Sequence, residues 1–456
     1  MIHVDTKLLM KYDRSGPRYT SYPTAPYLTP EIGYREYQQM LQSGNHLNEI
    51  SLYFHLPFCD TLCHFCGCTM LLTRSSARID TYLDYIEKEI TLLTQHFERK
   101  RKVSQLHWGG GTPNSLSPAQ IRRLGSVIHH HFDMQKDAEV SVELDPRGLT
   151  YDHMQAFHQV GFNRCSMGIQ DFSPDVQEAV NRVQSETISR QAVDWARNLG
   201  FKSINIDLIY GLPFQRPQTY EETLDKVIEI RPDRLAVFNY AHMPAMIKKQ
   251  RKINEEALPD PAVKLQLLKM AIEKLSSAGY AYIGMDHFAR PDDELCIALK
   301  EKTLYRNFQG YSTHAGLDLY SFGMSSISML PRIYVQNQKN IKSYFDALDK
   351  NTLPLARGIV LNDEDVLRRN VIMNLMCHFQ LDKNEIAGKY HIDFDKHFAE
   401  SLDQLKPFIS DGLVELKNGM IKVTETGRLV IRNIAMNFDQ YLMRKEGNKP
   451  IFSKTI

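Results

Sequence analysis

Between residues 51 and 240, short apolar strands alternate with helical patterns, and this rhythm constrains the fold more than any other feature. The strand-like runs are rich in β-branched and aromatic residues and lie at 51–56, 103–108, 139–144, 164–169, 203–209 and 234–240. Helical patterns at 82–97, 119–131, 188–199 and 220–230 separate several of them. Strands joined by helices build parallel sheets. Six such units predict an α/β fold, an incomplete (β/α)6 three-quarter TIM-like barrel, although an open doubly wound sheet would fit the same rhythm.

The two flanks of this region have a different character. Residues 1–50 are rich in Tyr and Pro and predict an extended arm, because proline restricts both itself and its predecessor. Past residue 330 helical segments predominate, at 341–348, 364–376 and 396–405, and a hairpin at 412–423 turns around Asn418-Gly419. We therefore expect a substrate or lid arm at 1–50, the barrel at 51–330, and a mostly helical, winged-helix-like C-terminal domain at 331–456.

Charge and hydropathy exclude several classes of protein. Lys and Arg number 55 and Asp and Glu 54, so the net charge is +1 and dedicated nucleic-acid binding is not expected. We find neither a signal-peptide pattern nor an apolar run of membrane-spanning length, and we expect a cytoplasmic protein without a membrane segment. In a reducing compartment, clustered cysteines indicate metal binding or catalysis before disulfides.

Four of the seven cysteines fall within ten residues, directly after the first strand. Because seven is an odd number, the cysteines cannot all form disulfides within the chain. The run Cys59-x3-Cys63-x2-Cys66 can hold three corners of a [4Fe–4S] cluster, which leaves the fourth iron open to a ligand. A zinc knuckle is the alternative, but it usually needs two separated Cys pairs. The spacing favours iron–sulfur. The scattered Cys165, Cys296 and Cys377 are expected in the core.

Further unusual residues lie at the ends of the predicted strands. A glycine run, Gly109-Gly-Gly-Thr-Pro113, follows the second strand, and its backbone can approach a ligand closely. Glu143, Gln170 and Asp207 end the next strands. Each alone would be read as a strand-end cap. Their recurrence at the carboxyl ends of parallel strands, the active-site face of such barrels, favours a function.

The C-x3-C-x2-C loop after the first strand, with the aromatic Phe65 before its third cysteine, resembles the radical S-adenosylmethionine (SAM) superfamily. The resemblance implies that Cys59, Cys63 and Cys66 hold a [4Fe–4S] cluster whose open iron binds the amino and carboxylate groups of SAM. An electron from the cluster would then release a 5′-deoxyadenosyl radical. No catalytic residue is assigned beyond the cluster and SAM.

Longer segments resemble the bacterial oxygen-independent coproporphyrinogen III oxidases (dehydrogenases). They are SGPRYTSYPTA (15–25), LHWGGGTP (106–113), NIDLIYGLP (205–213), FNYAH (238–242), GMDHFARPDDEL (284–295) and RNFQGYST (306–313). The resemblance covers nearly the whole chain. It implies decarboxylation of the propionates on rings A and B of coproporphyrinogen III to vinyl groups, which gives protoporphyrinogen IX. It also implies a reductant such as flavodoxin or ferredoxin, and we expect a monomer.

The resemblance also implies two SAM molecules. The first would be contacted by Tyr53, Gly110, Glu143 and Ile327. The second would be contacted by Phe65, Gly111, Thr112, Gln170, Arg182, Asp207 and Ala241. The substrate propionates need cations and hydroxyl groups, because guanidinium and carboxylate groups pair in a bidentate manner. The candidates for this are Arg14, Arg18, Tyr19, Tyr22, Arg290 and Arg306.

Two other functions use a similar barrel. A haem chaperone resembles it, but such relatives lack the arm and have Phe in place of the second Cys of the C-G-C ending. This chain keeps the arm and has Phe65-Cys66-Gly67-Cys68. A haem-degrading radical SAM methyltransferase is a third possibility. Cys68 could close the fourth iron, and we predict that it does not.

Overall fold

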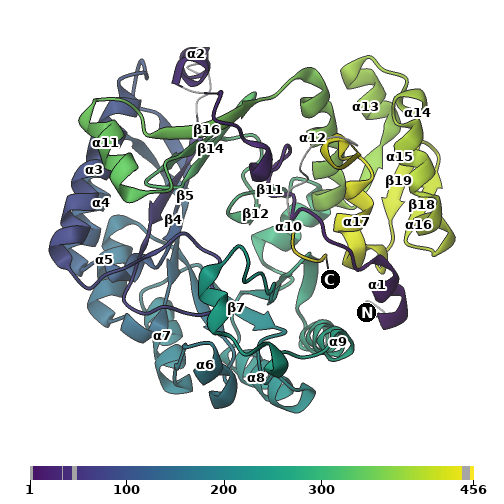
Figure 1. The fold of residues 1–456 in the computed structure, drawn as a ribbon, viewed down its shortest axis with the longest axis horizontal. Helices are drawn as coiled ribbons and strands as arrows, with labels where there is room; N and C mark the ends of the chain where they lie inside the picture. The colour runs from purple at the N-terminus through teal and green to yellow at the C-terminus, as the bar shows by residue number, and fades with distance from the viewer. Residues whose placement is uncertain (1–3, 33, 44–48, 444–451, 456) are drawn as a thin grey trace.

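A curved sheet of twelve strands forms the centre of the molecule (Figure 1). The computed structural model describes residues 4–32, 34–43, 49–443 and 452–455, and the rest of the predicted arm and C-terminal domain lies outside these ranges. The strand order is β16-β15-β14-β13-β1-β4-β5-β6-β7-β8-β10-β9. The two ends of this order, β16 and β9, are not paired with each other within the described residues, so the sheet is curved but open.

Seven adjacent strands of the sheet are parallel. They are β1 (Glu49–Leu56), β4 (Lys102–Gly110), β5 (Asp133–Leu144), β6 (Arg164–Gln170), β7 (Ser203–Tyr210), β8 (Arg234–Asn239) and β13 (Asp318–Phe322). All six predicted strands are among them, and the prediction of an α/β fold with an incomplete barrel is confirmed. The strand β13, which we did not predict, pairs with β1 on the side away from β4.

Antiparallel strands extend the sheet at both ends. Beyond β13 lie β14 (Ile327–Leu330), β15 (Ile333–Asn337) and β16 (Leu355–Val360), and beyond β8 lie β10 (His287–Ala289) and β9 (Ala281–Gly284). The expected barrel boundary between residues 330 and 331 therefore falls inside the sheet, between β14 and β15. These strands are short and do not follow the strand–helix rhythm on which the boundary was based.

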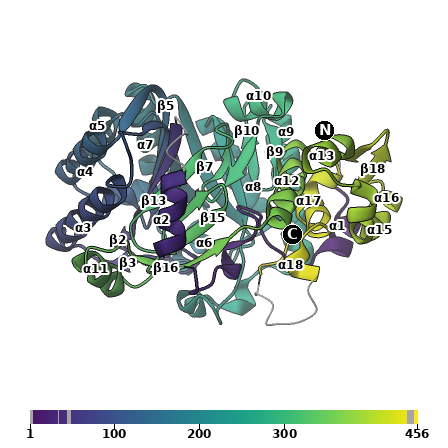
Figure 2. The same cartoon turned by 90° about the horizontal axis from the view of Figure 1, so that it is seen from above.

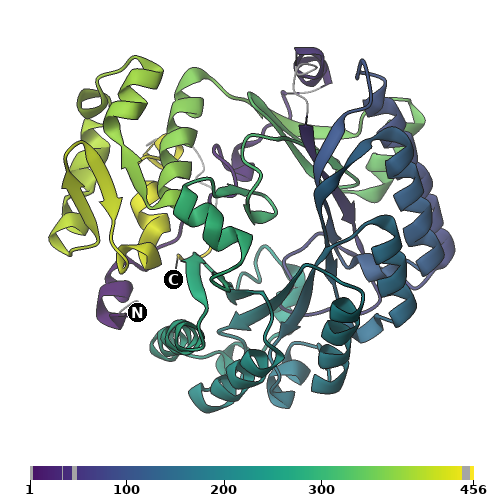
Figure 3. The same cartoon turned by 180° about the vertical axis from the view of Figure 1, so that it is seen from behind.

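Helices cover the outer face of the sheet (Figure 3). They are α3 (Ser76–Thr94), α4 (Pro118–His131), α5 (Tyr151–Val160), α6 (Pro174–Ala179), α7 (Glu186–Asn198), α8 (Pro217–Ile230), α9 (Pro261–Ser277) and α11 (Ile341–Asp349). The helix α10 (Glu294–Glu301) instead packs beside β9, and its Leu295 lines a cavity inside the barrel. In α3, Ile79, Leu83 and Ile86 recur at helical spacing and are buried against the sheet. None of the described helices has the length and apolar character needed to cross a membrane.

The C-terminal domain lies at one end of the molecule (Figure 2). It contains α12 (Asp363–His378), α13 (Lys383–Tyr390), α17 (Ile431–Met436), α18 (Gln440–Met443) and a small sheet of β17 (Gln380–Asp382), β19 (Met420–Val423) and β18 (Val414–Lys417). The predicted hairpin is present, and both turn residues, Asn418 and Gly419, have positive φ. The predicted helix at 396–405 is instead divided between two short helices, α14 (Phe394–His397) and α15 (Ala399–Gln404). A third, α16 (Lys406–Ser410), follows directly and has proline in its first turn.

The arm, with α1 (Thr6–Tyr12) and α2 (Tyr34–Ser43), connects the C-terminal domain to the far edge of the sheet. The hydroxyl of Tyr19 donates to Asp439 Oδ2 at 2.9 Å, and the hydroxyl of Tyr334 donates to the carbonyl of Tyr22 at 3.0 Å. Thr29 then pairs with Gly358 of β16. Tyr19 and Tyr22, two candidates for substrate binding, are completely buried and serve to anchor the arm.

Glu89 of α3 is a buried carboxyl group that joins the helix to the β13–β15 end of the sheet. Its Oε2 accepts from the backbone N–H of Gly323 at 2.8 Å and from the Tyr344 hydroxyl at 2.6 Å, and its Oε1 accepts from Asn337 Nδ2 at 2.6 Å. Burial raises the pKa of Glu89 to about 7, although these three hydrogen bonds oppose the shift. The group satisfies three donors in the interior.

We expect Glu89→Ala to lower the free energy of unfolding by about 3 kcal/mol, because it leaves three buried donors without an acceptor. Urea denaturation followed by circular dichroism measures the change. The matched control is Glu87→Ala on the same helix, whose half-exposed side chain makes only a 3.6 Å ion pair with Arg123, and which should cost less than about 0.5 kcal/mol. Equal losses in the two variants would contradict this role for Glu89.

Candidate active site

The cysteine loop begins directly after β1, at the carboxyl end of the parallel strands. A short parallel pair, β2 (Phe58–Cys59) with β3 (Leu71–Leu72), joins the two ends of this loop. Cys59, Cys63 and Cys66 all line one cavity of about 180 Å³. Among the described residues, no three Cys, His, Asp or Glu side chains are gathered closely enough to hold a single metal ion.

Cations surround the thiol groups in this cavity. Arg147 Nη2 lies 3.2 Å from Cys63 Sγ, and Arg182 Nη1 lies 3.5 Å from the same sulfur. A hydrogen bond with Cys68, opposed by burial and assisted by Lys249, lowers the pKa of the Cys66 thiol to about 6. Thiolates are the ligands of iron–sulfur clusters, and neighbouring cations offset their charge. The donor set thus fits a cluster held by three cysteines.

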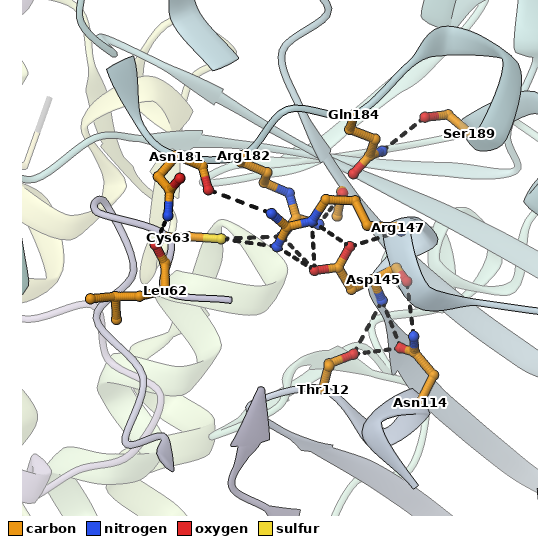
Figure 4. A network of polar contacts seen from close by, with 11 residues as sticks. Leu62, Cys63, Thr112, Asn114, Asp145, Arg147, Asn181, Arg182, Gln184 and Ser189 are labelled. Atoms are coloured by element: carbon orange, nitrogen blue, oxygen red, sulfur yellow. Dashed lines mark hydrogen bonds and ion pairs between the residues drawn. The ribbon is translucent and has the colours of Figure 1, made fainter. Parts of the chain in front are cut away.

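The two guanidinium groups are held by one carboxylate, Asp145, which follows β5 (Figure 4). Its Oδ2 lies 2.7 Å from Arg147 Nη2 and 3.0 Å from Arg182 Nη1. Burial raises the pKa of Asp145. The charges and hydrogen bonds of the two arginines lower this pKa by a larger amount, so it lies below the usual value. The backbone N–H of Asp145 also donates to Asn114 Oδ1 at 2.9 Å, and this oxygen accepts from Thr112 Oγ1 at 2.5 Å.

Asp145 and Arg147 were missed in the sequence analysis. Both lie just past Glu143 at a strand end, so the rule that identified Glu143 would have found them if it had been extended by a few residues. Lys249, which also lines the cavity, lies in a short 3-10 helix (Lys248–Lys252) past the end of β8 and carries no such signal.

The glycine run packs directly against the base of the cysteine loop. The N–H of Gly111 donates to the carbonyl of Leu56 at 2.9 Å. A Cβ atom on Gly111 would lie 2.5 Å from the carbonyl oxygen of Phe58 and 2.7 Å from that of Pro57. Gly110 has φ +122°, a conformation that favours glycine. These glycines are therefore required by contacts within the chain.

Glu143 is held as an anion beside this run. Its Oε1 lies 3.1 Å from His107 Nε2, and its Oε2 accepts from the N–H of Gly110 at 3.2 Å. Burial raises the pKa of Glu143, but His107 and the Gly110 N–H lower it more, so its pKa lies below the usual value. The ring of Tyr53 stacks on His107 at a centroid distance of 5.8 Å. A carboxylate in this setting can accept hydrogen bonds from a bound cation.

Asp207, two strands away from Glu143, is in a different electrostatic state. It accepts from Ser166 Oγ at 3.0 Å and from Asn205 Nδ2 at 2.7 Å. Burial raises the pKa of Asp207 to about 7, against the effect of these hydrogen bonds, and the charge of Glu143 raises it further. Gln170, on the strand between them, has a positive φ of 71°, which directs the chain sharply at the strand end.

Most of the predicted site residues line this one cavity: Cys59, Cys63, Phe65, Cys66, Gly110, Gly111, Thr112, Glu143, Gln170, Arg182 and Asp207. Tyr53, Ala241 and Ile327 lie outside its lining. The carbonyl of Ala241 shares the Gln250 amide with the carbonyl of Phe65, at 3.1 and 3.0 Å. The carbonyl of Ile327 accepts from Ser321 Oγ at 2.6 Å, and Ser321 pairs with Tyr53 in the sheet.

We expect Gly111→Ala to prevent assembly of an iron–sulfur cluster, because the added methyl group must displace the backbone that leads into Cys59. Iron and sulfide are counted after anaerobic reconstitution, and circular dichroism reports the fold. The control is Gly388→Ala in α13, where an added Cβ meets nothing within 4 Å. Full iron content in the Gly111 variant would contradict this account of the glycine run.

The chain matches two family models, the Radical SAM superfamily at residues 53–227 and the HemN C-terminal domain at residues 361–430. It is 47% identical over 452 residues to the oxygen-independent coproporphyrinogen III oxidase of Escherichia coli (strain K12), covering 99% of this chain and 98% of that protein. It is 44% identical to the Pseudomonas aeruginosa protein of the same name, covering 100% and 99%. The solved structure of coproporphyrinogen III oxidase (HemN) from Escherichia coli superimposes with a TM-score of 0.92 at 46% identity, covering 96% of this chain and 99% of that one.

Proposed function

The chain belongs to the oxygen-independent coproporphyrinogen III oxidases of the radical SAM superfamily, and from that premise we propose how its own residues carry the reaction. The reaction converts the propionates on rings A and B of coproporphyrinogen III to vinyl groups, with loss of CO2, and gives protoporphyrinogen IX in haem biosynthesis. The observation that carries the proposal is the single cavity that the three cysteines, the glycine run and the strand-end side chains of Glu143, Gln170 and Asp207 line together.

Cys59, Cys63 and Cys66 would hold the [4Fe–4S] cluster, and Arg147 and Arg182 would offset the charge of its thiolates. When bound, the cluster supplies the electron that generates a 5′-deoxyadenosyl radical from SAM. Asp145 positions both arginines, as their contacts of 2.7 and 3.0 Å support.

Two SAM molecules are part of the proposal. The anionic Glu143 suits the ammonium group of the first, which Tyr53, Gly110 and Ile327 would also contact. Asp207 is partly neutral near pH 7, and it can therefore either donate to or accept from a ribose hydroxyl. The second SAM would contact Asp207 together with Phe65, Gly111, Thr112, Gln170, Arg182 and Ala241.

The remaining assignments follow from the expected chemistry. We place the enzyme in the cytoplasm as a monomer that receives electrons from a reductant such as flavodoxin or ferredoxin. We retain the arm at 1–50, the radical SAM barrel at 51–330 and the C-terminal domain at 331–456 as functional divisions, although the sheet itself runs to Val360. The haem chaperone and the haem-degrading methyltransferase are not favoured by any contact in the site.

Anaerobic turnover tests the proposed function. The reconstituted protein, incubated with coproporphyrinogen III, SAM and dithionite, should form the divinyl product and two molecules of 5′-deoxyadenosine for each product molecule. Chromatography and mass spectrometry measure both. Formation of 5′-deoxyadenosine without a divinyl product would mean that the substrate is wrong, and haem binding without turnover would favour the chaperone.

The Cys68 thiol is expected to be dispensable for the cluster. Serine replacements of Cys59, Cys63 and Cys66 should each lose the cluster, because each removes one of three thiolate ligands. Cys68→Ser should keep its iron and sulfide. Electron paramagnetic resonance of the reduced Cys68 variant should still change when SAM is added, since the open iron remains available. Loss of iron from the Cys68 variant would make it a fourth ligand.

A further inference from the structure

Three arginines from distant parts of the chain gather near β8 and β10. They are Arg18 of the arm, Arg306 of β11 (Tyr305–Asn307) and Arg432 of α17. Burial lowers the pKa of Arg18 to about 9, and the charges of Arg432 and Arg306 lower it further. Burial also lowers the pKa of Arg432 to about 10, again with a contribution from Arg306. Contacts in the structure join the three groups. Arg432 donates to the carbonyls of Gly16 and Pro17, next to Arg18. Ring contacts of 5.7, 6.1, 5.3 and 4.7 Å run from Arg18 through Phe238, His287 and Tyr311 to Arg306.

The acidic partners around them do not balance this charge. Asp286 forms an ion pair with Arg18. Arg432 donates to backbone carbonyls of the arm and the C-terminal segment, including that of Pro17 at 3.0 Å. Asp13, the other carboxylate that acts on Arg432, is paired with Lys454 at 2.7 Å. Two cations thus remain with no carboxylate partner among the described residues.

Arg306 is the group whose donors are free. Its side chain is 2% exposed, and its guanidinium group lies 4.7 Å from the ring centroid of Tyr311. Its Nε and Nη1 atoms are buried and have no hydrogen-bond partner in the part of the chain that the structure describes. The neighbouring His287 is neutral, because burial and then the charges of Arg306 and Arg18 lower its pKa well below the usual value. A buried cation without an acceptor is costly unless an anion completes it.

The position of the three arginines suits a ligand that extends from the SAM site. Asp207 pairs with Ala236, which pairs with His287, so His287 lies two strand spacings, about 10 Å, from Asp207. The barrel cavity lined by Glu143, Asp207 and Phe238 also reaches His287 and Tyr311. The Arg18 guanidinium lies 5.7 Å from the ring centroid of Phe238. On the other side, Arg18 lines a cavity of about 520 Å³ together with Lys264 and Lys454.

We propose that Arg18, Arg306 and Arg432 form a carboxylate receptor that binds a propionate of the tetrapyrrole substrate, with Arg306 making the direct contact. The inference rests on the proposed function, which supplies the propionates. Arg306 would donate to a carboxylate oxygen from its free Nε or Nη1 atom. Arg18 would add a second positive charge beside the bound carboxylate. Arg432 would position the arm, and with it Arg18, by its hydrogen bonds to the carbonyls of Gly16 and Pro17. The other candidates, Arg14 and Arg290, are engaged with the carbonyl of Asn433 and with Asp292.

The test measures binding of coproporphyrin III, the oxidised and unreactive tetracarboxylate, to the reconstituted enzyme by its fluorescence. Its tetramethyl ester is the uncharged comparison. We expect Arg306→Gln to weaken binding of the acid about tenfold or more, because a charge-assisted pair is lost. Binding of the ester should be unchanged. Arg306→Lys should restore part of the affinity, and Arg122→Gln, an exposed change on α4, should bind the acid within about twofold of the wild type.

Each outcome decides between the two proposals. If Arg306→Gln binds the acid as tightly as the wild type, or loses the ester equally, the receptor is wrong even when the wild type converts coproporphyrinogen III. If the wild type does not convert the substrate but binds the acid through Arg306, the receptor stands and the proposed function fails. If the Arg306 variants do not fold, Arg18→Gln, whose side chain is 33% exposed, is measured in the same way, with the same loss expected for the acid alone.

Discussion

The ion pairs of Asp145 with Arg147 and Arg182 are the contact on which the arrangement of the active site depends. The carboxylate follows β5, whereas Arg182 comes from the loop after α6, so the contact joins two successive strand-end loops. Both guanidinium groups also reach Cys63 Sγ. The Asp145 carboxylate, shared by two cations, thus fixes the position of the Cys63 thiol relative to the strand ends. Removal of Asp145 would leave both guanidinium groups without their carboxylate partner.

The glycine run meets the same loop from the other side. Because a Cβ on Gly111 would approach the carbonyls of Pro57 and Phe58 to 2.5–2.7 Å, the strand β4 can only lie this close if the residue has no side chain. The cysteine loop is thus confined between a glycine backbone and an ion-pair network. Both hold the loop through groups that tolerate little change in position, which is the condition for a preorganised cluster site.

The arm meets both the C-terminal domain and the sheet. Tyr19, which the sequence suggested as a substrate contact, is completely buried and bonds to Asp439. Arg306, which in the sequence was only one of six candidates, is the buried cation with free donors. Arg432 carried no signal in the sequence, because its role depends on an arm more than 400 residues away in the chain. Long-range contacts of this kind leave no local pattern.

The sequence by itself determined the six parallel strands, the cysteine run after the first strand, the hairpin at Asn418-Gly419 and the strand-end positions of Glu143, Gln170 and Asp207. These features follow from local periodicity, turn chemistry and spacing, which can be read over a few residues. Only the tertiary structure decided that the sheet continues to Val360 and that Asp145 positions two arginines beside Cys63. It alone also brings Arg18, Arg306 and Arg432 together, with Asp286 as the one carboxylate that pairs with them among the described residues. Pairing of short edge strands and the balance of buried charge depend on which segments meet, and that is determined by packing of the whole chain.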